Sequence, residues 1–415
     1  MGDMMHDTAE QEEKIILIGV ATAENDDTEQ SLDELEELGQ TAGAVTLAKV
    51  IQNREKVHSA TYIGKGKIQE VKELVEKYDA DCVVCDDELT PAQYNNLQEE
   101  IGVKVIDRTV MILDIFAKRA STSEGKLQVE LAQLRYRASH LVGGRSELSR
   151  LGGGIGTRGP GEKKLELDRR LIKDRIVQLG RELEDIESHR SLARTQRMKS
   201  SVPVAAIVGY TNAGKSTLLN KLTQAGVLAE DKLFATLDPT TRGISLESGQ
   251  NVLMTDTVGF IRKLPHHLIE AFKSTLEEAK YADIIVHVVD SSSLQMDTQM
   301  HVVYSTLAEL GAGDKPVITL FNKRDKCESD ELPKDFKAEK VIYGSAKTGE
   351  GLEELKEAIE EILRAQKVYI EKVYPYDLAG KIQLIRKYGQ LLSEEYTESG
   401  IMVKAYVPSE IYSQI

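Results

Sequence analysis

The segment GYTNAGKS at Gly209–Ser216 decides the fold of this chain. It fits the pattern G-x-x-x-x-G-K-[ST], in which glycines let backbone N–H groups turn toward a polyphosphate. The apolar run VPVAAIV before it predicts a buried strand, and STLLNKLT after it predicts a helix whose N-terminus faces the phosphates. We expect the whole loop to line a nucleotide: Gly209, Tyr210, Thr211, Asn212, Ala213, Gly214, Lys215 and Ser216. In such a loop the lysine reaches the β- and γ-phosphates and the last hydroxyl binds Mg²⁺.

A second motif, DTVGF, begins at Asp256 after the short apolar strand NVLM. An Asp at the end of such a strand holds Mg²⁺, usually through water, and the N–H of Gly259 can meet a γ-phosphate. Thr257 and Val258 lie between them and are expected to line the nucleotide as well. A plain strand–turn junction is the alternative, because Asp and Gly both favour turns.

Between these motifs lies FATLDPTTR, residues 234–242. Thr236 is the candidate second Mg²⁺ ligand when a γ-phosphate is present, and on chemistry alone Thr240 and Thr241 are rivals for that role. Loops of this kind become ordered on a triphosphate and relax after hydrolysis. The residues expected near the nucleotide here are Phe234, Ala235, Thr236, Leu237 and Asp238.

The motif FNKRD follows the apolar strand PVITLF and carries the choice of base. A carboxylate at Asp325 accepts two N–H bonds from the N1 and N2 edge of guanine, and adenine offers no such pair of donors. An unpaired carboxylate in a closed site costs about 1–3 kcal/mol, so guanine is favoured. The remaining residues expected at the base are Asn322, Lys323, Arg324, Ser345, Ala346 and Lys347, the last three from GSAKTG.

The order of these motifs resembles that of a P-loop GTPase of the translation-factor-related class, from Val202 to about Leu363. Short apolar strands alternate with helical stretches, which predicts a doubly wound, mostly parallel sheet. Within this resemblance we assign catalysis to Lys215, Thr236 and Gly259, and the metal to Ser216 and Thr236.

Two positions bear on the expected rate of GTP hydrolysis. Related enzymes place a water-orienting Gln directly after the Gly of the third motif, whereas this chain has Phe260. Phenylalanine cannot orient water, so we expect slow hydrolysis until a partner completes the site. Asn212 stands where K⁺-stimulated GTPases carry Asn, which predicts faster hydrolysis in K⁺ than in Na⁺. A loop Asn that tolerates a turn conformation is the alternative.

Four further segments resemble the HflX family, and the resemblance covers nearly the whole chain: ATYIGKGKIQEV (60–71), VIDRTVMILDIFAKRA (105–120), GGGIGTRGPGEKKLELDRR (152–170) and GFIRKLPHHLIEAFKSTLEE (259–278). The resemblance implies a GTP hydrolase that associates with the large ribosomal subunit and its RNA, and some members split stalled ribosomes under stress. It also makes Phe260 typical of the family and favours Thr236 over its two rivals.

The sequence predicts four domains: an α/β domain at residues 1–116, a helical hairpin at 117–200 with a glycine-rich tip at 152–161, the GTPase domain at 201–366 and a small α/β domain at 367–415, which reads as strand, helix, strand. Hydrophobic residues spaced by seven, from Leu165 through Ile172 and Leu179 to Ile186, form the seam of the hairpin.

The net charge of the predicted hairpin differs from that of the whole chain. The chain carries −15 overall, but residues 117–200 hold 19 Lys and Arg against 11 Asp and Glu, a net charge of +8. This basic region is a plausible arm for RNA phosphates, with an ordinary solvated helix as the alternative. Without a signal-like or membrane-spanning segment, we expect a cytoplasmic monomer, with peripheral membrane association left open.

Two other functions remain open from the residues. One is a nucleotide-gated binding module that hydrolyses GTP only to reset itself. The other is an ATP-driven RNA remodeller, against which the carboxylate of Asp325 argues at the main site. The pair Cys82 and Cys85 lies on one predicted strand with side chains on opposite faces, so buried packing is expected rather than zinc binding.

Overall fold

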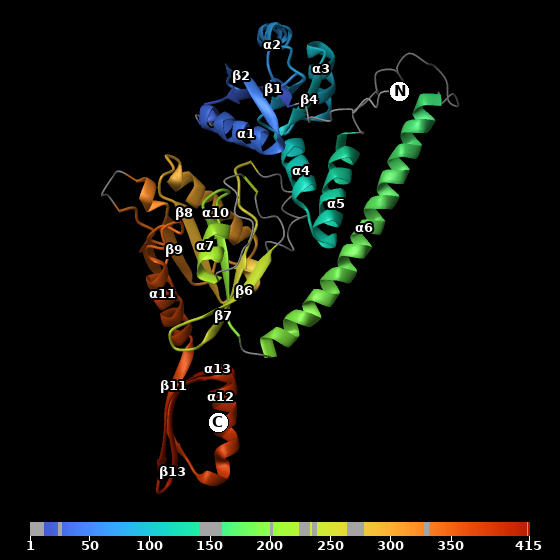
Figure 1. The fold of residues 1–415 in the computed structure, drawn as a ribbon. Coiled ribbons are helices and arrows are strands. Elements are labelled where there is room, and N and C mark those ends of the chain that lie inside the picture. The colour runs from blue at the N-terminus through green and yellow to red at the C-terminus, as the bar shows by residue number, and fades with distance from the viewer. Residues whose placement is uncertain are drawn as a thin grey trace, which may run out of the picture. The chain divides into compact units, whose positions relative to one another are not determined.

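The computed structural model describes residues 12–23, 27–140, 160–199, 202–223, 233–234, 239–263, 278–327, 332–412 and 414–415. Its strands form three sheets, and helices cover them (Figure 1). The chain folds into two compact units. The first is Met1–Asp185 with Lys232–Phe234 and Arg262–Phe272, and the second is Ile186–Asp231 with Ala235–Ile261 and Lys273–Ile415. The multidomain α/β fold expected from the sequence is confirmed.

The first sheet has four parallel strands in the order β2-β1-β3-β4. Its elements are β1 (Glu13–Ala21), α1 (Thr28–Ala42), β2 (Ala44–Asn53), α2 (Lys65–Tyr78), β3 (Cys82–Cys85), α3 (Pro91–Ile101), β4 (Lys104–Asp107) and α4 (Arg108–Arg119). Apolar side chains bury one face of each helix, as Leu32, Leu35 and Leu38 do on α1. Cys82 and Cys85 are both fully buried, which agrees with the expected packing role.

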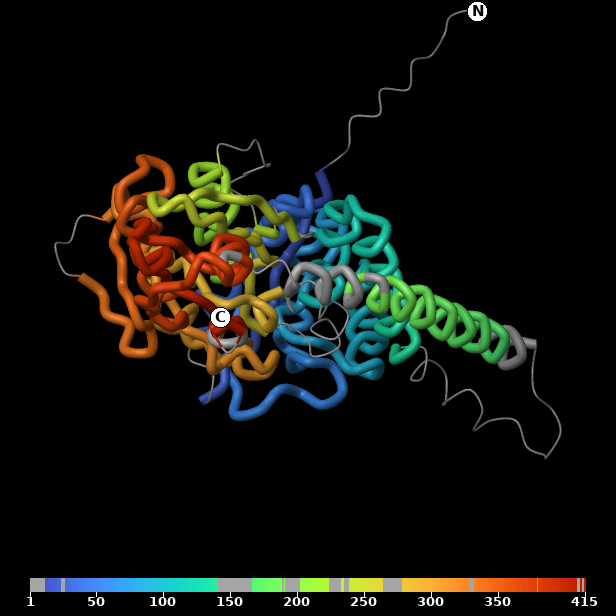
Figure 2. The backbone as a smooth tube through the Cα atoms, turned by 90° about the horizontal axis from the view of Figure 1, so that it is seen from below, coloured from blue at the N-terminus to red at the C-terminus, as the bar shows by residue number. Residues whose placement is uncertain are grey.

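Two helices follow, α5 (Ser123–His140) and the 40-residue α6 (Pro160–Lys199), which Figure 2 shows as one continuous helix. A paired salt bridge joins them, because Arg175 donates to both carboxylate oxygens of Glu130 at 2.8 and 2.9 Å. Leu179 in the predicted seam is fully buried, and Ile172 and Ile176 are half-buried. Residues 152–159 of the predicted tip lie outside the described residues.

The second sheet has six strands in the order β10-β9-β8-β5-β7-β6. Its elements are β5 (Val204–Gly209), α7 (Lys215–Thr223), β6 (Thr240–Ser245), β7 (Asn251–Asp256), β8 (Ile284–Asp290), α10 (Met296–Glu309), β9 (Val317–Asn322), the 3-10 turn η2 (Arg324–Lys326), β10 (Lys340–Tyr343) and α11 (Leu352–Ala365). All pairs are parallel except β6 with β7. The sequence does not predict the edge strand β6, because its residues TTRGIS are mostly polar. In the structure Ile244 is the buried residue of this strand, and the others are partly or fully exposed.

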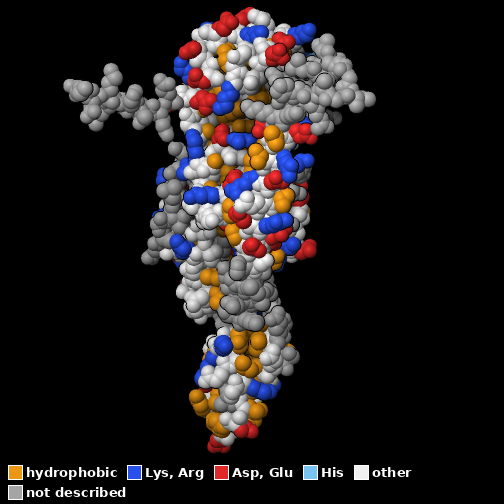
Figure 3. Space-filling view, turned by 90° about the vertical axis from the view of Figure 1, so that its right-hand side faces the viewer, with side chains coloured by type: hydrophobic (Ala, Val, Ile, Leu, Met, Phe, Trp, Pro, Cys, Tyr) orange, Lys and Arg blue, Asp and Glu red, His pale blue; other side chains and the backbone are white. Residues whose placement is uncertain are grey.

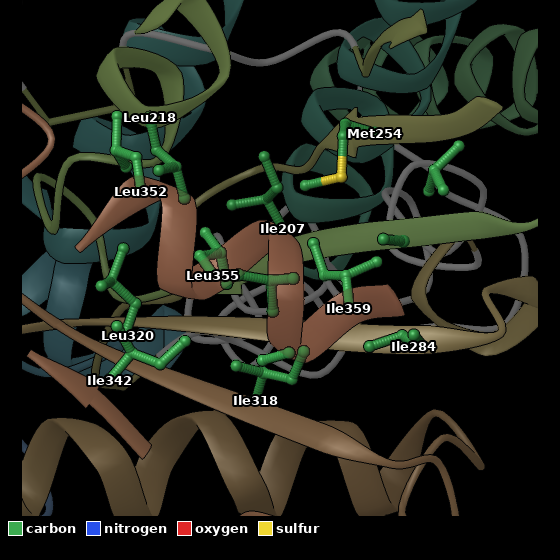
Figure 4. Packing of buried hydrophobic residues seen from close by; sticks show 14 of the residues in the cluster. Ile207, Leu218, Met254, Ile284, Ile318, Leu320, Ile342, Leu352, Leu355 and Ile359 are labelled. Carbon is green, nitrogen blue, oxygen red and sulfur yellow. The ribbon is translucent and has the colours of Figure 1, made fainter. Parts of the chain in front are cut away.

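One core lies between this sheet and its helices α7 and α11. Figure 4 shows Leu355 and Ile359 of α11 pointing toward Ile207 of β5 and Ile318 of β9. All four side chains are fully buried, and each contributes about 1.5–3 kcal/mol relative to an exposed position. This packing fixes the carboxyl ends of β5, β7 and β9 relative to one another, which is where the sequence motifs begin.

The third sheet is antiparallel, with the strand order β11-β13-β12. It comprises β11 (Lys367–Tyr374), η3 (Tyr376–Leu378), α12 (Ala379–Tyr388), β12 (Gln390–Thr397), β13 (Gly400–Pro408) and α13 (Ser409–Tyr412). The expected strand–helix–strand is therefore corrected to a strand and a helix followed by a hairpin. Ile382 and Ile385 of α12 bury one sheet face, and hydrophobic side chains also stand at the domain's surface (Figure 3, bottom).

Within the described residues, no helix combines the length and apolarity needed to cross a membrane. In the same part of the chain, no group of three or more His, Cys, Asp or Glu side chains is arranged to hold a metal ion.

A buried histidine makes the second unit sensitive to acid. His287 of β8 is 1% exposed, its ring meets Tyr304 edge-on at 5.1 Å, and its Nδ1 has no hydrogen-bond partner among the described residues. Burial lowers its pKa from 6.5 to about 4, although the carboxylate of Asp335 acts in the opposite direction. The unfolded chain therefore binds a proton between these two values that the folded chain does not.

We predict that the free energy of unfolding falls by about 2 kcal/mol between pH 7 and pH 5 because of His287, since stability is lost as the pH drops through 6.5 toward the folded pKa. Denaturant unfolding at both pH values measures this. The variant His287→Phe should lose that part of the pH dependence, and His301→Gln, at an exposed position, should keep it. An equal loss in wild type and His287→Phe would contradict the assignment.

Candidate functional site

The phosphate loop connects β5 to α7, as the sequence predicts. Gly209 ends β5, and Lys215 begins α7, whose N-terminal N–H groups face the loop. Gly214 has φ +100°, and a β-carbon there would collide with Nδ2 of Asn322. The loop therefore needs glycine at this position both for its conformation and for the close approach of Asn322.

Lys215 is folded back onto the loop in this arrangement. Its Nζ donates to the carbonyl oxygens of Gly209 at 3.2 Å and Tyr210 at 2.7 Å, and the residue is 7% exposed. Burial lowers the pKa of the ammonium group to about 8, and the nearby carboxylate of Asp256 opposes this shift. A phosphate anion beside the ammonium group would favour its charged form in the same way.

The predicted metal ligands are partly within the described residues. Ser216 Oγ donates to Oδ2 of Asp256 at 2.7 Å, so a hydroxyl and a carboxylate meet at the ends of α7 and β7. Hard oxygen donors of this kind suit Mg²⁺, and the residues present fit that ion. Thr236 lies outside the described residues, together with Ala235, Leu237 and Asp238. Thr240 and Thr241, the alternatives to Thr236 as a metal ligand, lie in β6, where Thr241 Oγ1 is 2.9 Å from Thr255 Oγ1.

The DTVGF segment is joined to the phosphate loop through its backbone. Phe260 N–H donates to Gly209 O at 3.1 Å, and Thr211 N–H donates to Phe260 O at 2.8 Å. A β-carbon on Gly259 would lie 2.8 Å from Thr211 and 2.9 Å from Lys215 Nζ. Gly259 thus lies against the lysine, and its contact with a γ-phosphate stays a prediction. Motif reasoning missed the backbone role of Phe260, whose side chain is 2% exposed.

The segment also contacts the central strand, because Thr257 Oγ1 donates to Ile207 O at 2.8 Å. Val258 is buried beside it at 4% exposed. These two predicted nucleotide-lining residues therefore support the segment from the side of the core.

The base loops meet at Asn322. Its Nδ2 donates to Ala213 O at 2.7 Å, and its Oδ1 accepts from Ala346 N–H at 2.8 Å, so one side chain joins the phosphate loop to GSAKTG. Arg324 N–H donates to Gly344 O at 3.2 Å, which adds a backbone link. The structure therefore brings together the three loops that the sequence placed apart.

The carboxylate of Asp325, which the sequence predicts to select guanine, accepts a hydrogen bond from the neighbouring loop. Ser345 Oγ donates to Asp325 Oδ1 at 2.6 Å, and this hydrogen bond is the main cause that lowers the pKa of the exposed Asp325. Lys323 has φ +62°, and its Nζ pairs with Asp290 Oδ2 at 2.7 Å. Sequence reasoning missed Asp290, although its place at the end of the apolar strand β8 was a usable signal.

Comparisons with known proteins agree with this geometry. Three family models match consecutive parts of the chain: GTP-binding GTPase N-terminal at residues 29–117, GTP-binding GTPase Middle Region at 119–197, and 50S ribosome-binding GTPase at 204–323. A protein named GTPase HflX from Lacrimispora saccharolytica is 66% identical over 404 residues, which cover 97% of this chain and 96% of the relative.

The chain belongs to the HflX family of GTPases. Another GTPase HflX, from Caldanaerobacter subterraneus, is 51% identical over 415 residues, covering 100% of this chain and 96% of its own. The GTPase HflX of Escherichia coli is 44% identical over 365 residues, covering 87% and 85%. The predicted family is thereby confirmed, and the chain is a GTP-binding GTP hydrolase.

For this HflX-family site, the variant Asp325→Asn is expected to weaken GDP binding about 10- to 100-fold and to strengthen binding of xanthosine diphosphate. The amide cannot accept both guanine N–H bonds, but it can donate to the carbonyl that xanthine carries at the same edge. Calorimetric titration of both nucleotides measures the change.

The exposed Asp314→Asn is the control, since it removes one negative charge elsewhere on the same domain. GDP affinity within threefold of wild type in Asp325→Asn would contradict the role of Asp325.

Proposed function

We propose that this chain hydrolyses GTP with Mg²⁺ while bound to the large ribosomal subunit, and that it splits or rescues stalled ribosomes under stress. The observation that carries the proposal is the match of residues 204–323 to a family described as 50S ribosome-binding GTPase, on a chain whose nucleotide loops meet at one place. GTP hydrolysis is the activity of the family. Binding to the large ribosomal subunit and the splitting or rescue of stalled ribosomes are the parts of the proposal that need a test.

The proposed chemistry is positioning and electrostatics. Lys215 stabilises charge on the β- and γ-phosphates, Gly259 donates its N–H to the γ-phosphate, and Asp325 selects guanine. Ser216 and Thr236 would ligate Mg²⁺, with Asp256 outside them, and the ion would neutralise charge that develops during phosphoryl transfer. The other residues that we propose at the nucleotide are Gly209, Tyr210, Thr211, Asn212, Ala213, Gly214, Phe234, Ala235, Leu237, Asp238, Thr257, Val258, Asn322, Lys323, Arg324, Ser345, Ala346 and Lys347.

The position after Gly259 supports slow hydrolysis without a partner, and Asn212 bears on stimulation by K⁺. Phe260 is buried and bonded through its backbone to the phosphate loop, so it offers no polar group to an attacking water. Asn212 has φ +60°, a left-handed conformation that Asn tolerates well, which gives the residue a structural reason to be there. Stimulation by K⁺ through its side chain remains part of the proposal.

The proposed contact with ribosomal RNA rests on the charge of the helical hairpin. Basic residues outnumber acidic ones between residues 117 and 200, and several of them are exposed on α6, including Arg170 and Lys173. Acidic and basic side chains are interspersed on the face shown in Figure 3. We therefore place the RNA contact at the glycine-rich tip with its flanking basic residues, and not along the whole helix.

The remaining assignments belong to the same proposal. The domains run 1–116, 117–200, 201–366 and 367–415, and the protein acts in the cytoplasm as a monomer, with peripheral membrane association left open.

Co-sedimentation with ribosomes and separated subunits tests the ribosomal target. We expect the full chain to pellet with the large subunit in a nonhydrolysable GTP analogue at least tenfold better than in GDP or ATP. Removal of residues 152–161 should abolish this preference, because the basic tip loses its reach to RNA phosphates.

Affinity of the deletion variant for the GTP analogue, measured in solution, is the control and should stay unchanged. Equal pelleting in GDP, ATP and GTP analogue would contradict the proposal.

A further inference from the structure

The motif FNKRD is supported by the end of a neighbouring strand that carries no nucleotide-binding motif of its own. Strand β8 ends at Asp290, which pairs in parallel with Asn322, the last residue of β9. One residue further on, Ser291 N–H donates to Asn322 O at 2.9 Å. The end of β8 is therefore fixed against the start of the base-recognition loop.

The carboxylate of Asp290 uses both of its oxygens. Oδ2 accepts from Lys323 Nζ at 2.7 Å, and the two side chains are only 18% and 17% exposed. Oδ1 accepts from the N–H of Ser292 at 3.0 Å and from its hydroxyl at 2.6 Å. Because Ser292 orients the carboxylate, the ammonium group of Lys323 meets an acceptor in a fixed position.

The charge of Lys323 lies close to other groups that we assign to the nucleotide. Burial is the main cause that lowers the pKa of Lys215 to about 8, and the positive charge of Lys323 acts in the same direction. Asp325 follows two residues after Lys323 and is exposed. A lysine carries its ammonium group on a flexible stem, so an unpaired Lys323 can turn toward another carboxylate within its reach.

The carboxylate of Asp325 must keep acceptor sites open for guanine. Oδ1 already accepts from Ser345 Oγ at 2.6 Å, and this hydrogen bond is the main cause that lowers the pKa of Asp325. An ammonium group paired directly with the same carboxylate would occupy lone pairs that the N1–H and N2–H of guanine require. Lys323 would then compete with the base for Asp325.

We propose that Asp290 is a positioning residue for guanine recognition: it holds the ammonium group of Lys323 at the end of β8 and so keeps it from pairing with Asp325. Asp290 lies 33 residues before Lys323 in the sequence and acts on the base only through it. The proposal rests on the base contact that we propose for Asp325, and it is independent of ribosome binding.

The expected consequence of losing Asp290 is weaker discrimination between bases, with phosphate binding retained. Inosine diphosphate lacks the 2-amino group of guanine, so comparing it with GDP isolates the N2–H bond to Asp325. A hydrogen bond to a charged group is worth about 10- to 100-fold in affinity, and we expect wild type to prefer GDP over inosine diphosphate by that factor. Once Lys323 pairs with Asp325, much of this preference is lost.

Calorimetric titration of the full chain with GDP, inosine diphosphate and inorganic pyrophosphate tests the proposal. Asp290→Asn removes the charge but keeps an oxygen for Ser292, and should lower the preference for GDP about 3- to 10-fold. Pyrophosphate, which has no base, should bind this variant within threefold of wild type. The control is Asp297→Asn, at an exposed position seven residues further on, which should keep the wild-type preference.

A double-mutant cycle shows whether Asp290 acts through the ammonium group. Lys323→Met retains an unbranched side chain of similar length without the charge, and should weaken GDP and inosine diphosphate together, so that their ratio stays within twofold of wild type. Adding Asp290→Asn to this variant should change the ratio no further, because no ammonium group is left to compete for Asp325. Two independent structural effects would instead add.

The proposal is overturned if Asp290→Asn keeps the wild-type ratio, or if it weakens pyrophosphate as much as GDP. It is also overturned if Lys323→Met alone loses the preference for GDP, or if Asp290→Asn lowers the ratio equally in the Lys323→Met background. A wild-type chain without any preference for GDP over inosine diphosphate would contradict the base contact of Asp325 itself, and this proposal with it.

Discussion

The nucleotide site depends on the two hydrogen bonds of Asn322. The side chain is 2% exposed, and its amide uses Nδ2 on the phosphate loop and Oδ1 on the loop that follows β10. The phosphate loop lies 109 residues before Asn322 in the sequence, so nothing local keeps the two loops at a fixed separation. Gly214 is glycine because Asn322 approaches so closely that a β-carbon would collide with it. Phosphate and base recognition are therefore fixed relative to each other by one buried amide.

The sequence alone was sufficient to predict the local structure where a short motif carries the chemistry. GYTNAGKS predicted the strand–loop–helix around Lys215, and FNKRD placed Asn322 and Asp325 at the end of a buried strand, where the structure has them. The fold class followed, because such motifs in this order demand a parallel sheet with loops at its carboxyl edge. The family followed from the four further segments that resemble it.

The rest depends on interactions that no motif encodes. The antiparallel strand β6 forms from polar residues because β7 offers it an edge, so its tertiary context overrides a weak local preference. The motif indicates only that the side chain of Phe260 cannot orient water, whereas in the structure its backbone makes the contact to the phosphate loop. The pairs Lys323–Asp290 and Lys263–Asp86 join residues 33 and 177 positions apart, and only the folded chain shows them.

These features together describe a site held at two places. Asn322 joins the phosphate loop to the loop that follows β10, and Phe260 attaches the DTVGF segment to the phosphate loop through its backbone. The loops that the sequence separates are thereby kept together by a buried amide and by backbone hydrogen bonds.

The most direct measurement is the affinity of Asn322→Ala for GDP and for inorganic pyrophosphate, which carries no base. If Asn322 fixes the phosphate loop, its loss weakens both ligands about 10- to 100-fold, since a buried donor and a buried acceptor lose their partners. Pyrophosphate affinity equal to that of wild type, with only GDP weakened, would show that Asn322 serves the base alone and would contradict this account.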